Sequence, residues 1–311
     1  MSVRITDYAM NRFAEVGGIL YGGGTLTDPG IQFTQFAPHA GLGTGTGTLS
    51  QSRTALFAEI PEPRPYTTGS YNANNNVYDP VNNYIEIKVV FVYEWTFTTA
   101  YNLTEFGAFA DQTGNNLLYH DFFRQDQSDA NSTPIVVSVV PGDILRLQME
   151  WYLRANWTSE TTVNFVINGT TGNNGAGRHD GRVRVYLDFG LDAGTAVDNA
   201  IITLLPKALS RARLGKSLSG PQPTGRDQPP ILGEAIESNS VLTEFLAYSN
   251  GTYRRDARFV WPTGQGITDA QVMVFDAGYG GFCFRFTNPS TFTKTANQTL
   301  EIIFRRTWTR I

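Results

Sequence analysis

The sequence predicts a mainly β protein: one or more antiparallel β-sandwich or barrel-like domains with a short N-terminal helix and a Pro/Gly-rich connecting segment. Three observations predict this class. Several segments alternate apolar and polar residues with the period of two that a half-buried strand requires. Gly, Pro, Asn and Asp separate these segments at short intervals, as in all-β folds. Helical spacing is limited to two short stretches, which leaves an α+β domain as the alternative.

Residues 6–16, TDYAMNRFAEV, are expected to form the helix. Apolar side chains recur in this stretch at roughly helical spacing, and Thr6 or Asp7 is a suitable N-cap. The pair Gly17 and Gly18 follows and is expected to end the helix.

The clearest strand pattern covers residues 84–100, where every second residue from Ile85 to Tyr93 is apolar. Residues 134–157 are expected to form a β-hairpin, because two apolar runs flank a Pro-Gly-Asp turn. Further strands are expected at 161–169, at 182–190 and in the segments QVMVFDAG, GFCFRFTNP and TLEIIFRRTWTRI near the C-terminus.

Changes in composition predict four parts along the chain. They are an N-terminal arm with the short helix (1–30), a β-rich domain (31–191), a linker with short helices (192–236) and a C-terminal β-rich unit (237–311) that can complete the same sheet system. The helices of the linker are expected within residues 198–214, broken or kinked at Pro206. A Pro- and Gly-rich segment, SGPQPTGRDQPP, follows them.

Two segments, NLTEFGAFA at 102–110 and VLTEFLAYS at 241–249, share the pattern Leu-Thr-Glu-Phe-x-Ala. Each precedes a turn-rich stretch and then an aromatic, basic strand. The match is consistent with duplication of a β unit, and equally with convergence in a biased composition. Glu105 and Glu244 are the acidic residues of the two blocks, and we expect both to be structural carboxylates that hold turn amides.

The composition excludes several classes of partner. The net charge is −4, and charged residues make up 17% of the chain, below the roughly 25% of typical soluble domains. Direct binding to nucleic acid is not expected, because it needs clustered Lys and Arg. No apolar run approaches the roughly 18 residues of a membrane span, so no membrane partner is expected. The single cysteine, Cys283, excludes an intrachain disulfide and is expected to be a buried thiol in a strand.

The stretch GLGTGTGTLSQSRTAL at 41–56 resembles a phosphate-binding loop at first sight. It lacks the lysine of the G-x-x-x-x-G-K-[ST] loop and the spacing of G-x-G-x-x-G, and it does not lie in a βαβ unit. The histidines form no H-E-x-x-H pair, and there is no G-x-S-x-G elbow; they are His39, His120 and His179. No catalytic, cofactor or metal site is therefore predicted, and the chain is not expected to be an enzyme.

An ordered set of motifs carries a resemblance over residues 40–155. These motifs are Gly43-Thr44-Gly45-Thr46, Thr54-Ala55-Leu56, Leu103 to Phe109, Leu117-Leu118-Tyr119 with Arg124, and Gly142-Asp143-Ile144-Leu145. They resemble structural proteins of tailed bacteriophages, in which a GTGTT…TAL loop precedes an ITE-x-G-x-F turn and a GD-x-L hairpin. The resemblance implies a non-enzymatic component of the tail, neck, collar or capsid surface, without indicating which.

The same resemblance implies a homo-oligomer whose partners are other copies of itself and other virion proteins. The expected location is the virion, after synthesis and assembly in the host bacterial cytoplasm. The neutral, Thr- and Asn-rich strands agree with this, because neutral surfaces desolvate at less cost than charged ones when subunits associate. The N-terminal arm and the segment 219–230 are expected to extend onto adjacent subunits.

Within this interpretation, the glycine-rich loop is expected to be a rigid surface turn that contacts a neighbouring molecule. Its small residues permit a tight path with positive φ where one is needed. Thr hydroxyl groups can satisfy exposed amides. The proposed interaction loop comprises Gly43, Thr44, Gly45, Thr46 and Gly47.

Two other function classes stay open. A carbohydrate- or receptor-binding fibre or spike module would display two or three Trp or Tyr side chains in an open groove, whereas a structural protein would bury them. The tryptophans that decide this are Trp95, Trp151, Trp157, Trp261 and Trp308. A glycan hydrolase is the third class, and the missing motifs disfavour it.

Overall fold

The computed structural model describes most of the chain between residues 4 and 310. The described ranges are 4–18, 31–72, 75–79, 81–82, 84–156, 161–169, 177–187, 211–216, 218–219, 231–232, 242–262, 264, 266–276, 280–288, 292–297 and 300–310. Strands make up 46% of the structure and helices 6%. The mainly β, antiparallel prediction is confirmed.

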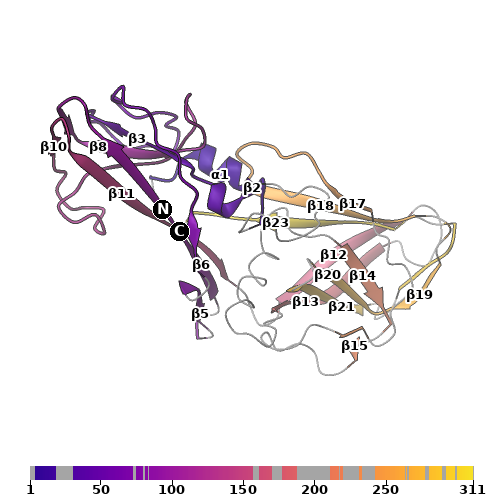
Figure 1. The fold of residues 1–311 in the computed structure, drawn as a ribbon. Coiled ribbons are helices and arrows are strands. Elements are labelled where there is room, and N and C mark those ends of the chain that lie inside the picture. The colour runs from indigo at the N-terminus through magenta and orange to yellow at the C-terminus, as the bar shows by residue number, and fades with distance from the viewer. Residues whose placement is uncertain are drawn as a thin grey trace.

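Two β units lie end to end, with helix α1 (Asp7–Phe13) between them (Figure 1). The first unit contains β2 (Ile31–Gln32), the 3-10 helix η1 (Phe33–Gln35), β3 (His39–Gly43), β4 (Ser70–Tyr71), β5 (Val77–Asp79), β6 (Tyr84–Thr96), β7 (Tyr101–Leu103), β8 (Glu105–Phe109), β9 (Leu117–Phe122), β10 (Val137–Val139) and β11 (Ile144–Asn156). Strand β1 (Val16–Gly18) follows α1 and pairs with β2 in the parallel direction.

The first unit is a β-sandwich. One sheet has the order β3-β8-β9, and the other has the order β11-β6-β4 with β5 also paired to β6. The core lies between the two sheets, because β6 directs Ile87, Val89, Phe91, Tyr93 and Trp95 inward, all at most 5% exposed. The alternation predicted for residues 84–100 therefore identifies this strand and its buried side, although the strand ends at Thr96; its outer face carries the polar residues together with Val90 and Val92.

The second unit is built on an eight-stranded sheet with the order β14-β20-β21-β13-β12-β23-β18-β17. The bounds of its strands are β12 (Thr161–Gly169), β13 (Gly177–Leu187), β14 (Arg211–Gly215), β15 (Leu218–Ser219), β16 (Ile231–Leu232), β17 (Leu242–Phe245), β18 (Arg254–Trp261), β19 (Ile267–Ala270), β20 (Val272–Asp276), β21 (Gly280–Asn288), β22 (Phe292–Lys294) and β23 (Leu300–Thr307). Strands β15 and β16 pair with each other, as do β19 and β22.

This topology places the boundary between units differently from the predicted division at residue 191. Strands β12 and β13 belong to the same sheet as the C-terminal strands, so the sheets change between β11 and β12. The C-terminal strands lie in the same sheet as β12 and β13. Strands β18 and β23 run from this sheet toward α1 (Figure 1).

The expected hairpin at 134–157 does not form. Strand β10 pairs with β7, whereas β11 pairs with β6 along its whole length. The Pro141-Gly142 turn, with Gly142 at φ 92°, is present but carries the chain from one strand pair to another. The long alternating strand β6 matches all thirteen residues of β11, a far longer ladder than the three residues of β10 allow.

Thr6 caps α1 as predicted, since its hydroxyl accepts a hydrogen bond from the amide of Ala9. The helix ends at Phe13, before the glycine pair, and Gly17 and Gly18 lie in β1. Residues 211–215, expected to be helical, form β14 against β20, because tertiary pairing overrides local propensity. Residues 198–210 lie outside the described residues. Within the described part of the chain, no helix is long and apolar enough to span a membrane.

Candidate functional site

The predicted interaction loop begins in β3 and continues as extended chain rather than as a turn. The glycines at 41, 43, 45 and 47 alternate and therefore share one face of the extended segment. A Cβ at Gly45 would lie 2.6 Å from the Ala58 nitrogen and from Oε1 of Glu105. These glycines do not have positive φ, so the expected reason for them was wrong. They are required because a carboxylate and a backbone segment approach this face closely.

The group that approaches is Glu105, the first residue of β8, which is fully buried. Its Oε1 accepts hydrogen bonds from the amides of Gly45 at 3.1 Å and Ala58 at 2.8 Å. Its Oε2 accepts one from the amide of Phe57 at 2.9 Å. One side chain thus fastens the glycine-rich segment to the segment at 57–58, which is the structural role expected of this carboxylate.

His120 completes the site from the neighbouring strand β9. Its Nε2 lies 2.7 Å from Oε2 of Glu105, and its ring packs against Phe57 with ring centroids 5.2 Å apart. Burial raises the pKa of Glu105, but the hydrogen bonds from His120, Ala58 and Phe57 outweigh it and hold the pKa below its usual range. The carboxylate is therefore ionised, with its acceptor sites occupied by groups of its own chain.

The outer side of this arrangement is exposed. Thr44, Thr46 and Gly47 are exposed, whereas Gly43 is buried beside Glu105. The Thr104 hydroxyl donates to the Gly45 carbonyl at 2.6 Å and fixes the segment further. The result is a rigid extended strip that presents threonine side chains to its surroundings.

Glu244 has no comparable role, which corrects the prediction for this residue. It lies in β17 at the edge of the large sheet, is exposed, and forms an ion pair with Arg258 at 3.2 Å. Both glutamates do lie in a strand of an antiparallel pair, Glu105 in β8 with β9 and Glu244 in β17 with β18. Glu105 is buried because β8 is a central strand of a sandwich, whereas an edge strand leaves Glu244 in solvent.

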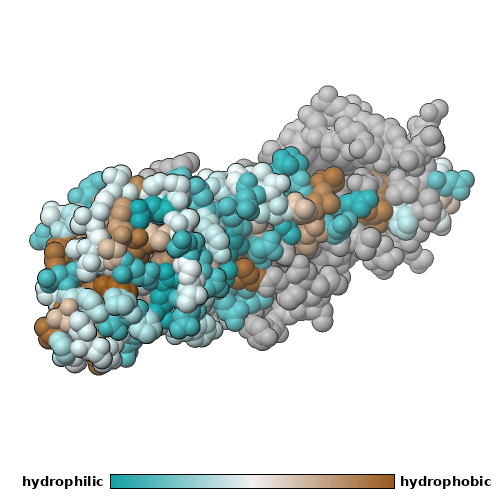
Figure 2. All heavy atoms as spheres, turned by 90° about the horizontal axis from the view of Figure 1, so that it is seen from above, coloured by the Kyte–Doolittle hydropathy of each residue, from teal (hydrophilic) through white to brown (hydrophobic). Residues whose placement is uncertain are grey.

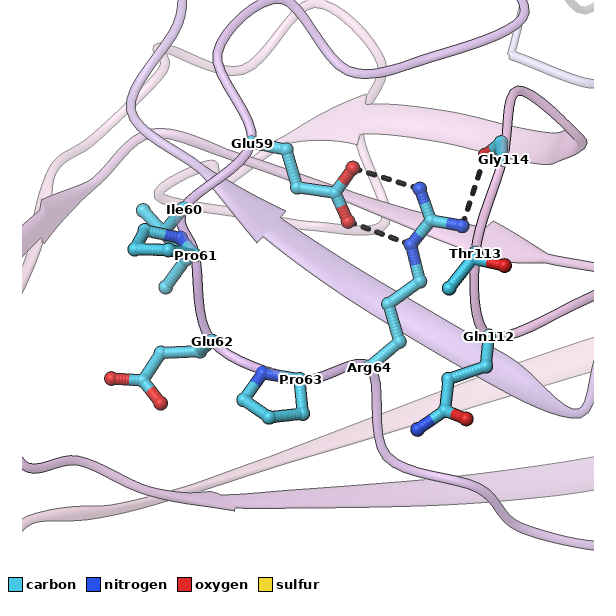
Figure 3. Close-up of a pocket in the computed structure, with 9 residues that line it drawn as sticks. All are labelled: Glu59, Ile60, Pro61, Glu62, Pro63, Arg64, Gln112, Thr113 and Gly114. Carbon is cyan, nitrogen blue, oxygen red and sulfur yellow. Dashed lines mark hydrogen bonds and ion pairs between the residues drawn. The ribbon is translucent and has the colours of Figure 1, made fainter.

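A shallow pocket of about 400 Å³ lies between residues 59–64 and 112–114 (Figure 3). Arg64 crosses it, and its guanidinium forms a bidentate ion pair with Glu59 at 2.7 and 2.8 Å. The same group donates to the carbonyls of Gly114 and Asp111 and stacks over the Phe109 ring at 3.4 Å. The guanidinium thus binds groups of its own chain, so Arg64 holds a loop in place rather than binding an anion in the pocket.

A second buried carboxylate, Asp121 in β9, joins distant segments in the same way. It pairs with Arg4 at 2.9 Å and with Arg124 at 3.2 Å, and is itself fully buried. Arg124 also donates to the Ser132 carbonyl at 2.7 Å. Sequence patterns did not reveal this cluster, because its members show no local spacing that marks them as partners.

The N-terminal helix and the C-terminal residues form the junction between the two units. Arg310 pairs with Asp7 at 2.5 Å and donates to the Ile5 carbonyl, which places the two ends of the described chain side by side (Figure 1). The Trp308 indole donates to the Met10 carbonyl at 3.0 Å and packs against Phe13. Residues 4–18 thus contact their own chain, and their extension onto an adjacent subunit stays a prediction. Residues 19–30 and 220–230 lie outside the described residues.

The tryptophans that distinguish a glycan-binding groove are packed in the described structure. Trp95 and Trp261 are buried, Trp151 packs edge-on against Phe36, and Trp308 lies in the junction. Trp157 lies outside the described residues. The face shown in Figure 2 is mainly hydrophilic, with separate apolar areas toward the end of the first unit. The four described tryptophans therefore do not form an open aromatic groove.

The remaining candidate residues do not converge. His39 lies at the start of β3 against Tyr66, where burial lowers its pKa. His179 and Cys283 lie in β13 and β21, and their side chains are outside the described part. Within the described ranges, no three His, Cys, Asp or Glu side chains group as metal ligands.

Comparison with protein-family models, with curated proteins and with solved structures gave no match. The buried charged residues described above, Glu105, Asp121 and Arg64, all bind groups of the same chain.

Proposed function

We propose that this chain is a non-enzymatic structural component of a tailed-phage virion, where it assembles as a homo-oligomer in the tail, neck or collar or on the capsid surface. The proposal rests on the buried charged side chains, which bind groups of their own chain. Glu105, Asp121 and Arg64 each join segments far apart in the sequence. Such fastening gives a rigid shape, which a building block needs.

The ordered motif resemblance over residues 40–155 supports the same proposal, and two of its motifs meet in space. The glycine-rich segment and the Glu105 block form one hydrogen-bonded unit. The pairing explains why a protein of this kind carries both motifs, since the alternating glycines admit the carboxylate. The exposed threonines of the strip then offer a neutral surface to other virion proteins.

The packed tryptophans favour this proposal over a carbohydrate- or receptor-binding module. A glycan site needs aromatic faces open to solvent, whereas the described tryptophans contact protein. In the pocket, the guanidinium of Arg64 is already bound to Glu59, which also argues against a ligand site there.

Density-gradient sedimentation of lysates from infected cells tests the proposal. The expected result is that the protein sediments with intact particles and stays with them after a high-salt wash. Recovery of the protein only in the soluble fraction, while known particle proteins sediment, would overturn the proposed function.

A further inference from the structure

Strand β11 (Ile144–Asn156) is an exposed edge of the first sandwich. In the part of the chain that the structure describes, it pairs with β6 on one side and with no strand on the other. Its thirteen residues contain no Pro or Lys, two residues that often protect an edge strand from pairing with another chain, although it does carry Arg146, Glu150 and Arg154. The edges of the eight-stranded sheet, β14 and β17, are much shorter, with five and four residues.

The outward face of β11 carries charges of both signs and exposed apolar groups. In order, its outward residues are Ile144, Arg146, Gln148, Glu150, Tyr152 and Arg154. Ile144 is 64% exposed and Tyr152 is 49% exposed. A strand paired along this edge would cover both side chains. On the inward face, Leu145, Leu147 and Trp151 are only partly buried at the rim of the core.

We propose that β11 pairs antiparallel with β11 of a second copy of this chain, in the register centred on Gln148. In this register Arg146 lies opposite Glu150 of the other copy, twice by symmetry, and Ile144 lies opposite Tyr152. On the inward face Leu145 faces Trp151, so the partner covers the open rim of the core. The interface is isologous, as a two-fold axis requires, and its main-chain hydrogen bonds join the two sandwiches through one continuous sheet.

Three other registers are less favourable. A shift of one residue turns the charged face of one copy against the apolar face of the other. A register centred on Glu150 places Glu150 against Glu150 and Arg146 against Arg154, and like charges directly opposite are unfavourable. A register centred on Tyr152 uses Arg154, which Glu86 and the Tyr84 ring already hold. Arg146, by contrast, has a side chain that is 70% exposed in its ion pair with Glu94.

This inference deepens the proposed function, because it rests on self-assembly and names the surface that contacts the second copy. A direct test uses Gln148→Cys in a Cys283→Ser background, so that the introduced thiol is the only one. Opposed residues of an antiparallel pair have Cα atoms about 4.5–5.5 Å apart, within disulfide range. The expected result is a disulfide-linked dimer of the full chain under mild oxidation.

Two matched variants serve as controls. Val92 lies opposite Gln148 on β6, on the same exposed face but one strand inward. Val92→Cys should not cross-link, because three strand spacings, about 14 Å, would separate the two thiols. Tyr152→Cys should cross-link only in the register centred on Tyr152, so a dimer from Tyr152→Cys without one from Gln148→Cys would overturn the proposed register.

Charge reversal provides an independent test by sedimentation equilibrium. Arg146→Glu places Glu against Glu150, and Glu150→Arg places Arg against Arg146, so each variant alone should dimerise roughly tenfold more weakly. An equimolar mixture of the two should recover dimers, because each contact between unlike variants then joins opposite charges. The contacts with Glu94 and Lys88 within each chain are the same in the mixture as in the separate variants. Recovery therefore reports only contacts between copies.

The outcomes separate this inference from the proposed function. The β11 interface is overturned if two results occur together. Gln148→Cys melts at the same temperature as the parent but gives no cross-linked dimer, and the mixture of charge variants recovers no dimers. The proposed function would still stand if the chain sediments with particles. A cross-linked dimer of Gln148→Cys, from a chain absent from particles, would support the interface and contradict the virion role.

Discussion

Glu105 shows how one buried carboxylate determines the surface above it. Its oxygens accept hydrogen bonds from three amides, and His120 closes the site from β9. An uncompensated buried charge would be costly, but here each oxygen is paired. Ionisation of this residue is therefore part of the folded structure and not a sign of general acid–base chemistry.

Replacement of Glu105 should show this in the free energy of unfolding. Glu105→Ala leaves buried amides without an acceptor and should cost about 3 kcal/mol. Glu105→Gln keeps one oxygen for Gly45 and Ala58 and should cost about 1 kcal/mol. Glu244→Ala is the matched control from the second LTEF block and should change stability by less than about 0.5 kcal/mol. Equal effects at the two positions in urea denaturation would contradict the structural role of Glu105.

The same carboxylate predicts a pH dependence. The pKa of Glu105 is lowered in the folded protein, so its contribution is complete above the ordinary value of 4.5 and is lost as pH falls through the lowered pKa. The stability difference between the parent and Glu105→Gln should therefore shrink between about pH 5 and pH 3. A difference that stays constant over this range would rule out Glu105 as the group with the lowered pKa.

Gly45 gives a prediction of a different kind. A Cβ there would meet the Ala58 nitrogen, a backbone atom that cannot turn away, and Oε1 of Glu105. Gly45→Ala should destabilise the protein by about 2 kcal/mol through overpacking. Thr46→Ala, on the exposed part of the strip, should be neutral within about 0.5 kcal/mol. Thermal unfolding that ranks the two variants in the opposite order would remove the packing explanation.

Helix α1 acts as a connector between the two β units. Its Asn11 side chain accepts hydrogen bonds from the Tyr248 hydroxyl and the Gly251 amide, and Glu15 pairs with Arg255. On the other side, Thr6 donates to the Leu117 carbonyl of β9. A helix of seven residues is too short to be stable alone, so its order depends on these contacts with both units.

Trp308→Ala should loosen this junction. The substitution removes the packing on Phe13 and the hydrogen bond to Met10, and should cost about 2 kcal/mol. Calorimetry should then resolve two unfolding transitions, because the units become less strongly coupled. Thr309→Ala, at an exposed neighbouring position, is the control. A single unshifted transition for Trp308→Ala would show that this side chain is not what couples the units.

Local patterns predicted the elements better than their partners. The alternation of β6 indicated both its identity as a strand and its buried face, since a period of two is a local property. The pairing of β10 with β7, and of β14 with β20, depends on contacts far apart in the sequence and has no local signature. The same reason separates Glu105 from Glu244: within identical tetrapeptides, one glutamate lies in a central strand and the other in an edge strand.

The candidate site was predictable only in part. The glycine alternation and the LTEF motif marked both halves of the site, but no local pattern indicates that they touch. Their contact places Glu105 against Gly43 and Gly45, so the expected rigid turn is instead a fixed strip of chain. The roles of Asp121 and Arg64 were not predicted, because a charged side chain that becomes buried against distant segments looks like ordinary surface charge in the sequence.

In the described part of the chain, the two units, their junction and the unpaired edge of β11 together agree with the proposed role of a building block that contacts a second copy. The buried charges fasten the chain to itself. The outward groups are neutral on the glycine-rich strip and self-complementary on β11. These features are the ones that repeated assembly requires.

Absolute quantification of this protein by mass spectrometry of purified virions is the decisive test of the proposed virion role. Isotope-labelled peptides from the chain, measured against peptides of the major capsid protein, give its copy number per particle. A structural component should be present in several copies at a fixed ratio, as a symmetric oligomer requires. Absence from the particles, or a variable trace below one copy each, would show that the chain is not a building block of the virion.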